Sequence, residues 1–171
     1  MGVYVLRLGH RTFRDKRIST HCGLVARALG AEGMIYTGER DEKLEESIKK
    51  VVSIWGGFFS IKYSKSWKKV VENFSGKTVH LTMYGIPIQE RIKRIRREKD
   101  LLVIVGGEKV PGEVYGVSDW NIAVTNQPHS EVAALAIFLH EYFQGKELEM
   151  EFPGCKKKIV PQEKGKKVEN V

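Results

Sequence analysis

The sequence has few of the residues that would place it in several large protein classes. Only two cysteines, Cys22 and Cys155, occur in 171 residues, and their contexts suggest neither a zinc site nor a disulfide framework. No stretch reaches the roughly 18 apolar residues of a membrane span, and the N-terminal residues lack the apolar core of a secretory signal. We therefore expect a cytoplasmic protein with two reduced thiols and no membrane contact.

Several motifs that carry nucleotide binding or catalysis are also missing. The chain contains neither the GxxxxGK[ST] of a P-loop nor a GxGxxG between an early strand and helix. Its five histidines show no HExxH or related spacing, so we expect no metal site. Cys22 directly follows His21, and adjacent side chains rarely face each other, so a hydrolase with Cys22 as nucleophile is a remote alternative.

Basic residues, by contrast, are in excess. Twenty-nine Lys and Arg stand against 21 acidic residues, which gives a formal net charge of +8. This balance favours a polyanionic partner such as nucleic acid, although solubility explains a basic composition equally well. Net charge alone therefore does not distinguish a nucleic-acid-binding protein from one with an incidental excess of basic residues, and the sequence motifs are needed for this distinction.

Apolar strand-like runs alternate with helical patterns over residues 1–146. We predict strands at 3–8, from 34, at 58–63, 79–84, 101–105 and 121–125, and helices ending near residue 30, at 41–55, at 66–74, from 88 to 95 and from 132 to 143, the last strongly amphipathic. The alternation predicts an α/β domain with a mostly parallel sheet and helices on both faces. The run 101–105 is apolar throughout, which indicates a central strand covered on both sides.

Residues 147–171 differ from this pattern. KELEMEF alternates polar and apolar residues, Pro153-Gly154 is a turn signal, and CKKKIVP can return as a second strand. The residues after 160 have the composition of a disordered segment. We therefore predict a domain at 1–146 and an extension at 147–171, in which a hairpin at 147–160 precedes a flexible basic tail.

Three loop segments, 81–85, 105–111 and 122–130, follow the last three predicted strands. In an open α/β sheet, ligands bind outside the carboxyl ends of the strands. The segments combine glycines, which permit close backbone approach, with apolar walls and a few polar groups. Any one glycine is more simply explained by a turn, but three such loops together predict a site for an adenosine-sized ligand.

Arginines crowd the segment after the first predicted strand, where Arg11, Arg14, Arg17 and Arg27 fall within seventeen residues. Guanidinium groups pair bidentately with phosphates, so the density favours contact with an RNA backbone over an ordinary connection. A solvated basic surface is the alternative for each arginine taken alone. The predicted helix from 88 to 95 continues into a second basic group that includes Arg91 and Arg94, which we expect to contact RNA phosphates together with the tail lysines.

The motifs resemble those of a known enzyme class. HCGLVARALG at 21–30 resembles the first motif of SpoU-like 2′-O-methyltransferases, with Arg27 at the position of their catalytic arginine and His21 in place of their usual asparagine. GGE at 106–108 resembles the second motif. The stretch 121–134 resembles the third only in part, because Ser-Glu-Val stands here instead of Ser-Leu-Asn.

A closer resemblance covers nearly the whole chain. RTFRDKRISTHCGLVARALGA, HLTMYG, GGEKVPGEVY and NQPHSEVAALA are similar to blocks of the archaeal tRNA (cytidine(56)-2′-O)-methyltransferases. This resemblance implies a SPOUT fold with a C-terminal trefoil knot, a homodimer, S-adenosylmethionine bound in the knot loops, and the ribose of a T-loop cytidine of tRNA as methyl acceptor. None of these properties follows from periodicity, since knots are too rare to predict from a pattern.

The resemblance also assigns roles to individual residues. Arg27, with Arg14 or Arg17, is expected to position a phosphate and the ribose for in-line attack. Because an arginine stays protonated, we expect phosphate clamping by Arg27, with water or a polar neighbour taking the hydroxyl proton, and Arg11 as an RNA contact. The expected cofactor contacts are Leu81, Thr82, Tyr84, Gly85, Gly106, Gly107, Glu108, Lys109, Val110, Val124, Asn126, Ser130, Val132 and Ala133.

Two further alternatives remain beside this interpretation. One is a related methyltransferase that acts on another RNA position, from which only the close family resemblance separates this chain. The other is a non-catalytic RNA-binding module that has lost its cofactor, against which the intact GGE and NQPHS segments argue. Failure to bind S-adenosylmethionine would favour the second.

Overall fold

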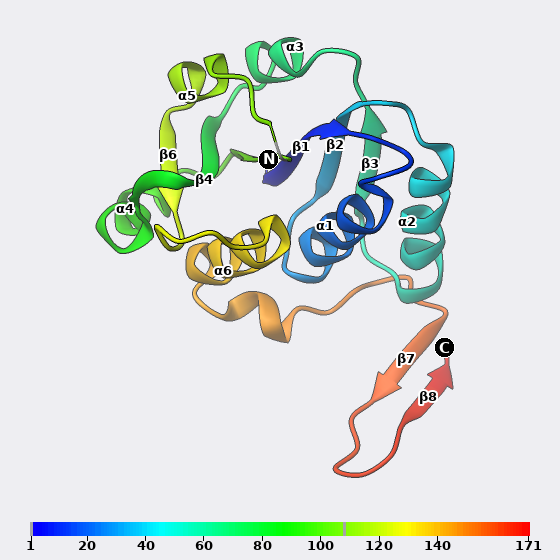
Figure 1. Cartoon of the computed structure of the whole chain (residues 1–171). Coiled ribbons are helices and arrows are strands. Elements are labelled where there is room, and N and C mark those ends of the chain that lie inside the picture. The colour runs from blue at the N-terminus through cyan, green and yellow to red at the C-terminus, as the bar shows by residue number, and fades with distance from the viewer. Residues whose placement is uncertain (1, 108) are drawn as a thin grey trace.

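A computed structural model describes residues 2–107 and 109–171, and the centre of this part of the chain is a six-stranded parallel sheet (Figure 1). The strand order is β3-β2-β1-β5-β4-β6. The strands are β1 (Val3–His10), β2 (Gly33–Gly38), β3 (Ser60–Tyr63), β4 (Lys77–Pro87), β5 (Leu101–Val105) and β6 (Trp120–Ala123). The parallel sheet predicted from the alternating pattern is confirmed.

Helices cover both faces of the sheet and produce two hydrophobic cores. The helices are α1 (Lys16–Ala28), α2 (Glu42–Trp55), α3 (Trp67–Glu72), α4 (Ile88–Ile95), α5 (Glu113–Val117) and α6 (Glu131–Phe143). Residues of α1, α2, α4 and α6 contribute to the larger core, whereas α3 and α5 pack over the smaller one on the other face. The prediction of helices on both faces is therefore confirmed.

The centre of the sheet is formed by β1 and β5. All five residues of β5 are buried, and the strand pairs with β1 on one side and β4 on the other. Covered on both faces and paired on both edges, β5 has no position that favours a polar side chain. Its predicted central place is confirmed.

The connection between β4 and α4 contains an irregularity that shapes the site. Ile122 of β6 is opposite Leu81 and again opposite Ile86 of β4. The intervening residues 82–85 therefore leave the ladder and bulge away from it before pairing resumes. The strand predicted at 79–84 is thus longer than expected, and its middle forms a loop at the carboxyl edge of the sheet.

Two helices differ from the sequence prediction. Residues 113–117 form α5, a helix that was not among the predicted elements. Helix α6 is apolar on most of its circumference rather than strongly amphipathic, since Ala133 and Ile137 lie on its exposed side, Ile137 with 48% of its surface accessible. A helix that is apolar all round is normally covered on all sides.

The C-terminal hairpin exists, but not where it was predicted. The two-stranded antiparallel sheet joins β7 (Lys157–Val160) to β8 (Lys167–Asn170), so the tail expected to be disordered supplies its second strand. Residues 146–149 form a 3₁₀ turn instead of a strand, because Glu147 is buried at 2% exposure and accepts a hydrogen bond from His140 Nδ1 at 2.6 Å. The division into two domains stays a prediction.

The described residues hold no helix with the length and apolar character required to cross a bilayer. Over the same ranges, no three His, Cys, Asp or Glu side chains gather in an arrangement that could hold a metal ion.

Candidate active site

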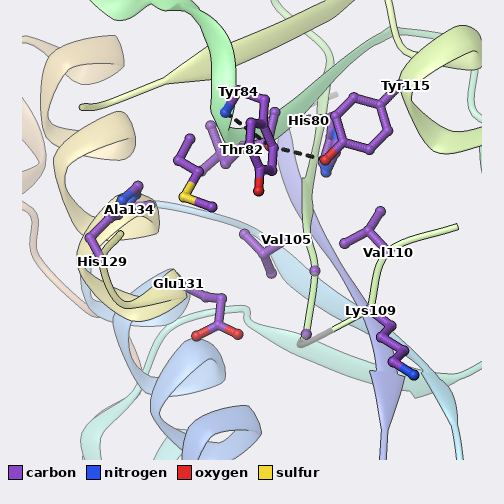
Figure 2. A pocket seen from close by; sticks show the side chains of 14 residues that line it. His80, Thr82, Tyr84, Val105, Lys109, Val110, Tyr115, His129, Glu131 and Ala134 are labelled. Atoms are coloured by element: carbon purple, nitrogen blue, oxygen red, sulfur yellow. Dashed lines mark hydrogen bonds between the residues drawn. The ribbon is translucent and has the colours of Figure 1, made fainter. Parts of the chain in front are cut away.

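A cavity of about 540 Å³ opens at the carboxyl ends of β4 and β5 beside the start of α6 (Figure 2). Its volume lies within the range of about 300–1,000 Å³ typical of small-molecule sites. The lining residues are His80, Leu81, Thr82, Met83, Tyr84, Val105, Gly106, Gly107, Lys109, Val110, Tyr115, His129, Glu131 and Ala134. Its position matches the rule for ligand sites in parallel sheets.

Half of the predicted cofactor contacts line this cavity. They are Leu81, Thr82, Tyr84, Gly106, Gly107, Lys109 and Val110. Gly85, Val124, Asn126, Ser130, Val132 and Ala133 do not belong to the lining, and Glu108 lies outside the described residues. The three loops thus converge as predicted, although their individual contacts with a ligand stay predictions.

Some of the predicted residues outside the lining hold the loops in place. Asn126 Nδ2 donates hydrogen bonds to the carbonyl oxygens of Met83, at 2.7 Å, and Gly85, at 3.0 Å. Ser130 caps α6, its hydroxyl accepting a hydrogen bond from the Val132 amide at 3.2 Å. These contacts tie the 82–85 bulge to the segment that precedes α6 and so form one wall of the cavity.

Polar groups that the sequence interpretation did not select also face the cavity. His80 is fully buried, and its ring meets that of Tyr115 edge to face at 4.7 Å. Burial lowers the pKa of His80 below its ordinary value. Glu131 extends from the first turn of α6 toward the side formed by Val105 and Lys109 (Figure 2). In the sequence, these two residues are marked only by their neighbours, because His80 precedes the predicted contact Leu81 and Glu131 follows the predicted contact Ser130.

A buried arginine, Arg7, holds the loop that contains Gly106 and Gly107 by hydrogen bonding to its backbone. Arg7 on β1 is 1% exposed, and its Nη1 donates hydrogen bonds to the carbonyl oxygens of Gly106 and, at 3.1 Å, of Leu8. A side-chain carbon added to Gly107 would lie 3.3 Å from Arg7 Nη1. Glycine at this position therefore lets the loop lie directly on the guanidinium group. Arg7 escaped prediction because it lies inside an otherwise apolar strand.

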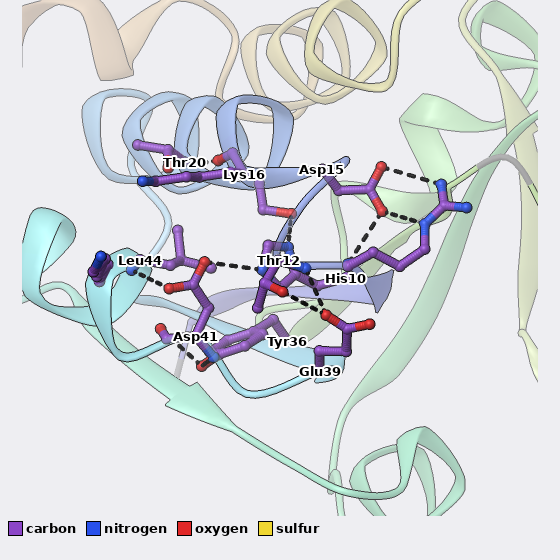
Figure 3. A network of polar contacts seen from close by, with 12 residues as sticks. His10, Thr12, Asp15, Lys16, Thr20, Tyr36, Glu39, Asp41 and Leu44 are labelled. Carbon is purple, nitrogen blue, oxygen red and sulfur yellow. Dashed lines mark hydrogen bonds and ion pairs between the residues drawn. The ribbon is translucent and has the colours of Figure 1, made fainter.

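The arginine-rich loop after β1 is held by local ion pairs and hydrogen bonds (Figure 3). Arg11 Nε donates to Asp15 Oδ2 at 2.8 Å, and this contact with Arg11 is the main cause that lowers the Asp15 pKa. The Thr12 hydroxyl donates to Glu39 at 2.6 Å. The loop thus presents Arg14 and, in the first turn of α1, Arg17, both exposed.

A Ser–His–Asp arrangement lies beneath this loop. His10 Nδ1 is 2.8 Å from Ser19 Oγ, and His10 Nε2 is 3.3 Å from Asp41 Oδ2. Burial would raise the Asp41 pKa, but hydrogen bonds from the Leu44 amide and His10 hold it below its ordinary value. All three side chains are buried, so no substrate reaches the serine. The network anchors the loop and caps α2, rather than acting as a hydrolase.

Arg27 does not line the cavity of its own chain. Its side chain is at the end of α1, away from the cavity, where Nη2 donates to the carbonyl oxygens of Trp55 at 3.0 Å and Gly56 at 2.7 Å. The guanidinium carbon lies 4.5 Å from the centre of the Phe152 ring. A helix that follows a parallel strand returns to the opposite edge of the sheet, so its last turn cannot reach the carboxyl edge within one chain. The clamping of the substrate phosphate by Arg27 therefore stays a prediction.

Arg27→Met separates a structural role from a catalytic one, and the contacts of Arg27 within this chain predict a destabilised fold with chemistry retained. Methionine keeps much of the aliphatic stem but loses two hydrogen bonds and the contact with Phe152, a loss of about 2–3 kcal/mol. Urea unfolding measures the loss, and kcat of the folded variant should stay within about twofold of wild type. A drop of several hundredfold in kcat with unchanged stability would restore the catalytic role.

Comparison with known proteins agrees with this site. The model of the family "tRNA ribose 2′-O-methyltransferase, aTrm56" matches residues 55–169. The tRNA (cytidine(56)-2′-O)-methyltransferase of Pyrococcus horikoshii is 52% identical over 173 residues, which cover 99% of this chain and 85% of that protein. The enzyme of the same name from Methanocaldococcus jannaschii is 58% identical over 173 residues, covering 98% and 96%.

A solved structure shares the fold at much lower sequence identity. The SpoU methyltransferase AviRb from Streptomyces viridochromogenes, in complex with the cofactor AdoMet, superposes with a TM-score of 0.60 at 16% identity. The match covers 85% of this chain and 57% of that one, which confirms the predicted fold class. With a family model over most of its length and relatives that are more than half identical, the chain belongs to the aTrm56 family of tRNA ribose 2′-O-methyltransferases.

Proposed function

We propose that this chain transfers the methyl group of S-adenosylmethionine to the ribose 2′-hydroxyl of cytidine 56 in tRNA. The observation that carries the proposal is the cavity at the carboxyl edge, whose described lining residues all fall within the range that the family model matches. The relatives that are more than half identical carry the name of this activity. A reaction on tRNA also agrees with the cytoplasmic location expected from the sequence.

The cavity residues fit S-adenosylmethionine. Leu81, Val105 and Val110 supply apolar walls for the adenosine, and the Gly106-Gly107 backbone permits close approach. The Glu131 carboxylate offers a negative charge to a cofactor that carries a positive sulfur. When bound, S-adenosylmethionine supplies an electrophilic methyl group.

The chain's own part in the reaction is to bind and orient the ribose. We assign phosphate binding to Arg14 and Arg17, because Arg14 is exposed on a loop that a buried network holds at the carboxyl edge and Arg17 is exposed in the adjoining first turn of α1. Orientation of the hydroxyl toward the methyl group accounts for much of the rate enhancement in such transfers. Water or a polar neighbour takes the hydroxyl proton, since arginine stays protonated.

Arg14→Ala and Arg17→Ala should each lower kcat/KM for tRNA by about 10- to 100-fold, the value of one hydrogen bond to a charged group. Binding of S-adenosylhomocysteine should change much less than kcat/KM, because neither residue lines the cavity of its own chain. Lys50→Ala, on the exposed face of α2, is the matched control for loss of a positive charge. Equal rates for the three variants would remove the two arginines from the reaction.

A second copy of the chain completes the proposed enzyme. The outward side of α6 exposes Ala133 and Ile137 although the helix is apolar nearly all round, which favours burial against a partner. We propose a homodimer whose partner brings its arginine loop to this cavity. The trefoil knot implied by the family resemblance belongs to the same proposal.

The proposed RNA surface includes α4. Arg91 and Arg94 are exposed there, whereas Arg96 is engaged, donating hydrogen bonds to the Glu141 carbonyl oxygen at 2.8 Å and to its carboxylate at 3.0 Å. We assign phosphate contacts to Arg91 and Arg94 on this basis. We assign an RNA contact to Arg11 as well, whose guanidinium group pairs with Asp15.

The experiment that tests the proposal is methyl transfer from labelled S-adenosylmethionine to an unmodified tRNA transcript, followed by nucleoside mapping. The expected product is 2′-O-methylcytidine at position 56, and a transcript with 2′-deoxycytidine there should take no label. Label at another nucleotide would keep the reaction class and overturn the target. Absence of both cofactor binding and label would favour the non-catalytic RNA-binding module.

A further inference from the structure

The His80 ring carries a buried nitrogen that nothing in the described part of the chain satisfies. His80 is fully buried in β4, and its Nδ1 lies 2.9 Å from Asn121 Oδ1. Its Nε2 has no hydrogen-bond partner among the described residues. A buried polar atom of this kind costs about 1–3 kcal/mol when left unpaired.

The neighbours of His80 determine which ring nitrogen carries the proton. Asn121 Nδ2 donates a hydrogen bond to the carbonyl oxygen of Tyr115 at 2.9 Å. A carbonyl only accepts, so the amide of Asn121 must turn its NH₂ group to Tyr115 and its oxygen to His80. In the neutral ring, His80 Nδ1 is then the donor and Nε2 holds a lone pair.

The ring that carries the unpaired acceptor belongs to the lining of the cavity. His80 lines the cavity together with Leu81, Val110 and Tyr115. Figure 2 shows His80 and Tyr115 side by side, away from the Glu131 carboxylate. Aromatic and apolar surfaces of this kind suit a planar heterocycle, whereas a cationic group is better placed beside Glu131.

We propose that His80 Nε2 accepts a hydrogen bond from the exocyclic amino group of the cofactor's adenine, and that His80 thereby selects adenine over hypoxanthine. The proposal rests on the assignment of this cavity to S-adenosylmethionine. Adenine presents an N–H donor at this position, whereas hypoxanthine presents a carbonyl oxygen, which would face the lone pair of Nε2. A site built around a buried acceptor rejects a ligand that cannot donate to it.

Calorimetry with two product analogues tests the selection. Wild-type protein should bind S-adenosylhomocysteine about 10- to 100-fold more tightly than S-inosylhomocysteine, the effect of one unpaired buried polar group. In His80→Leu this ratio should fall close to one, because adenine loses its acceptor and hypoxanthine loses the repulsion. A wild-type ratio near one, or an unchanged ratio in the variant, would overturn the role of His80.

Nitrogen-15 NMR of wild-type protein keeps the proposal testable if His80→Leu does not fold. The Nε2 resonance should have the chemical shift of an unprotonated ring nitrogen and should move on addition of S-adenosylhomocysteine. A protonated Nε2 would overturn the proposal. If S-adenosylhomocysteine binds and methyl transfer proceeds while the selection is absent, only the role of His80 fails. If neither analogue binds, the assignment of the cavity fails as well.

Discussion

Glu131→Lys is expected to abolish binding of S-adenosylmethionine while the chain stays folded. Glu131 lines the cavity from the first turn of α6, and its side chain is partly exposed. Two unit charges about 5 Å apart interact by about 3 kcal/mol at an effective dielectric constant of 20, and less with solvent screening. Reversal of the charge turns this attraction for the cofactor's positive sulfur into repulsion, so affinity should fall by at least about 100-fold.

The neutral variant Glu131→Gln isolates the charge itself. S-adenosylmethionine and S-adenosylhomocysteine differ in the methyl group and in the charge on sulfur, while their other groups are the same. Glu131→Gln should therefore lower the affinity for S-adenosylmethionine about 10-fold and the affinity for S-adenosylhomocysteine clearly less. Equal weakening of both ligands, measured by calorimetry, would show that Glu131 does not face the sulfur.

A matched control separates this effect from damage to the helix. Glu90 occupies the first turn of α4 and is exposed outside the cavity. Loss of an acidic group at a helix N-terminus costs about 0.3–1 kcal/mol in either helix. Glu90→Lys should thus match Glu131→Lys in thermal stability but retain wild-type affinity for the cofactor.

Gly85→Ala is expected to displace the cavity wall, because the added methyl group would clash with the backbone of β6. A methyl carbon at this position would lie 2.6 Å from the carbonyl carbon and oxygen of Asn121 and from the amide nitrogen of Ile122. These are backbone atoms of β6, which cannot rotate away as a side chain can. The 82–85 bulge must therefore move, and with it Thr82, Met83 and Tyr84 of the cavity lining.

The displacement should affect both stability and binding. Overpacking of a buried site costs about 1–3 kcal/mol of stability. The hydrogen bonds that Asn126 donates to the carbonyl oxygens of Met83 and Gly85 would also be distorted. A shift of about 1 Å in a binding wall can reduce function on the order of 100-fold. We expect a loss of this size in affinity for S-adenosylhomocysteine, together with a lower urea midpoint.

Gly112→Ala provides the control, since no heavy atom lies within 4 Å of a methyl group added there. Its backbone has right-handed helical angles, so alanine should be neutral in stability and binding. If Gly85→Ala binds as well as Gly112→Ala, the bulge is not held in a single position by β6.

Much of the fold follows from local patterns that the tertiary structure leaves unchanged. The fully apolar run of β5 identifies a central parallel strand, and the helix predicted at 41–55 begins where Asp41 caps α2 by accepting a 3.0 Å hydrogen bond from the Leu44 amide. The convergence of the three loops follows from strand direction alone, because parallel strands end at one edge. Local patterns failed at Glu147, where burial overrode them, and in β8, whose four exposed residues form a strand by pairing with β7.

The individual roles of polar residues depend on contacts between distant segments. Sequence similarity placed Arg27 in the reaction, but the direction of α1 carries it to Trp55, Gly56 and Phe152. The unpaired acceptor of His80 exists only because Asn121, 41 residues away, is itself oriented by the Tyr115 carbonyl. The sequence by itself determined the class of fold, the family and the expected place of the site, since these depend on periodicity, strand direction and short contiguous motifs. Only the tertiary structure decided which charged and polar groups face the cavity, because burial and hydrogen bonding join residues that no spacing in the chain connects.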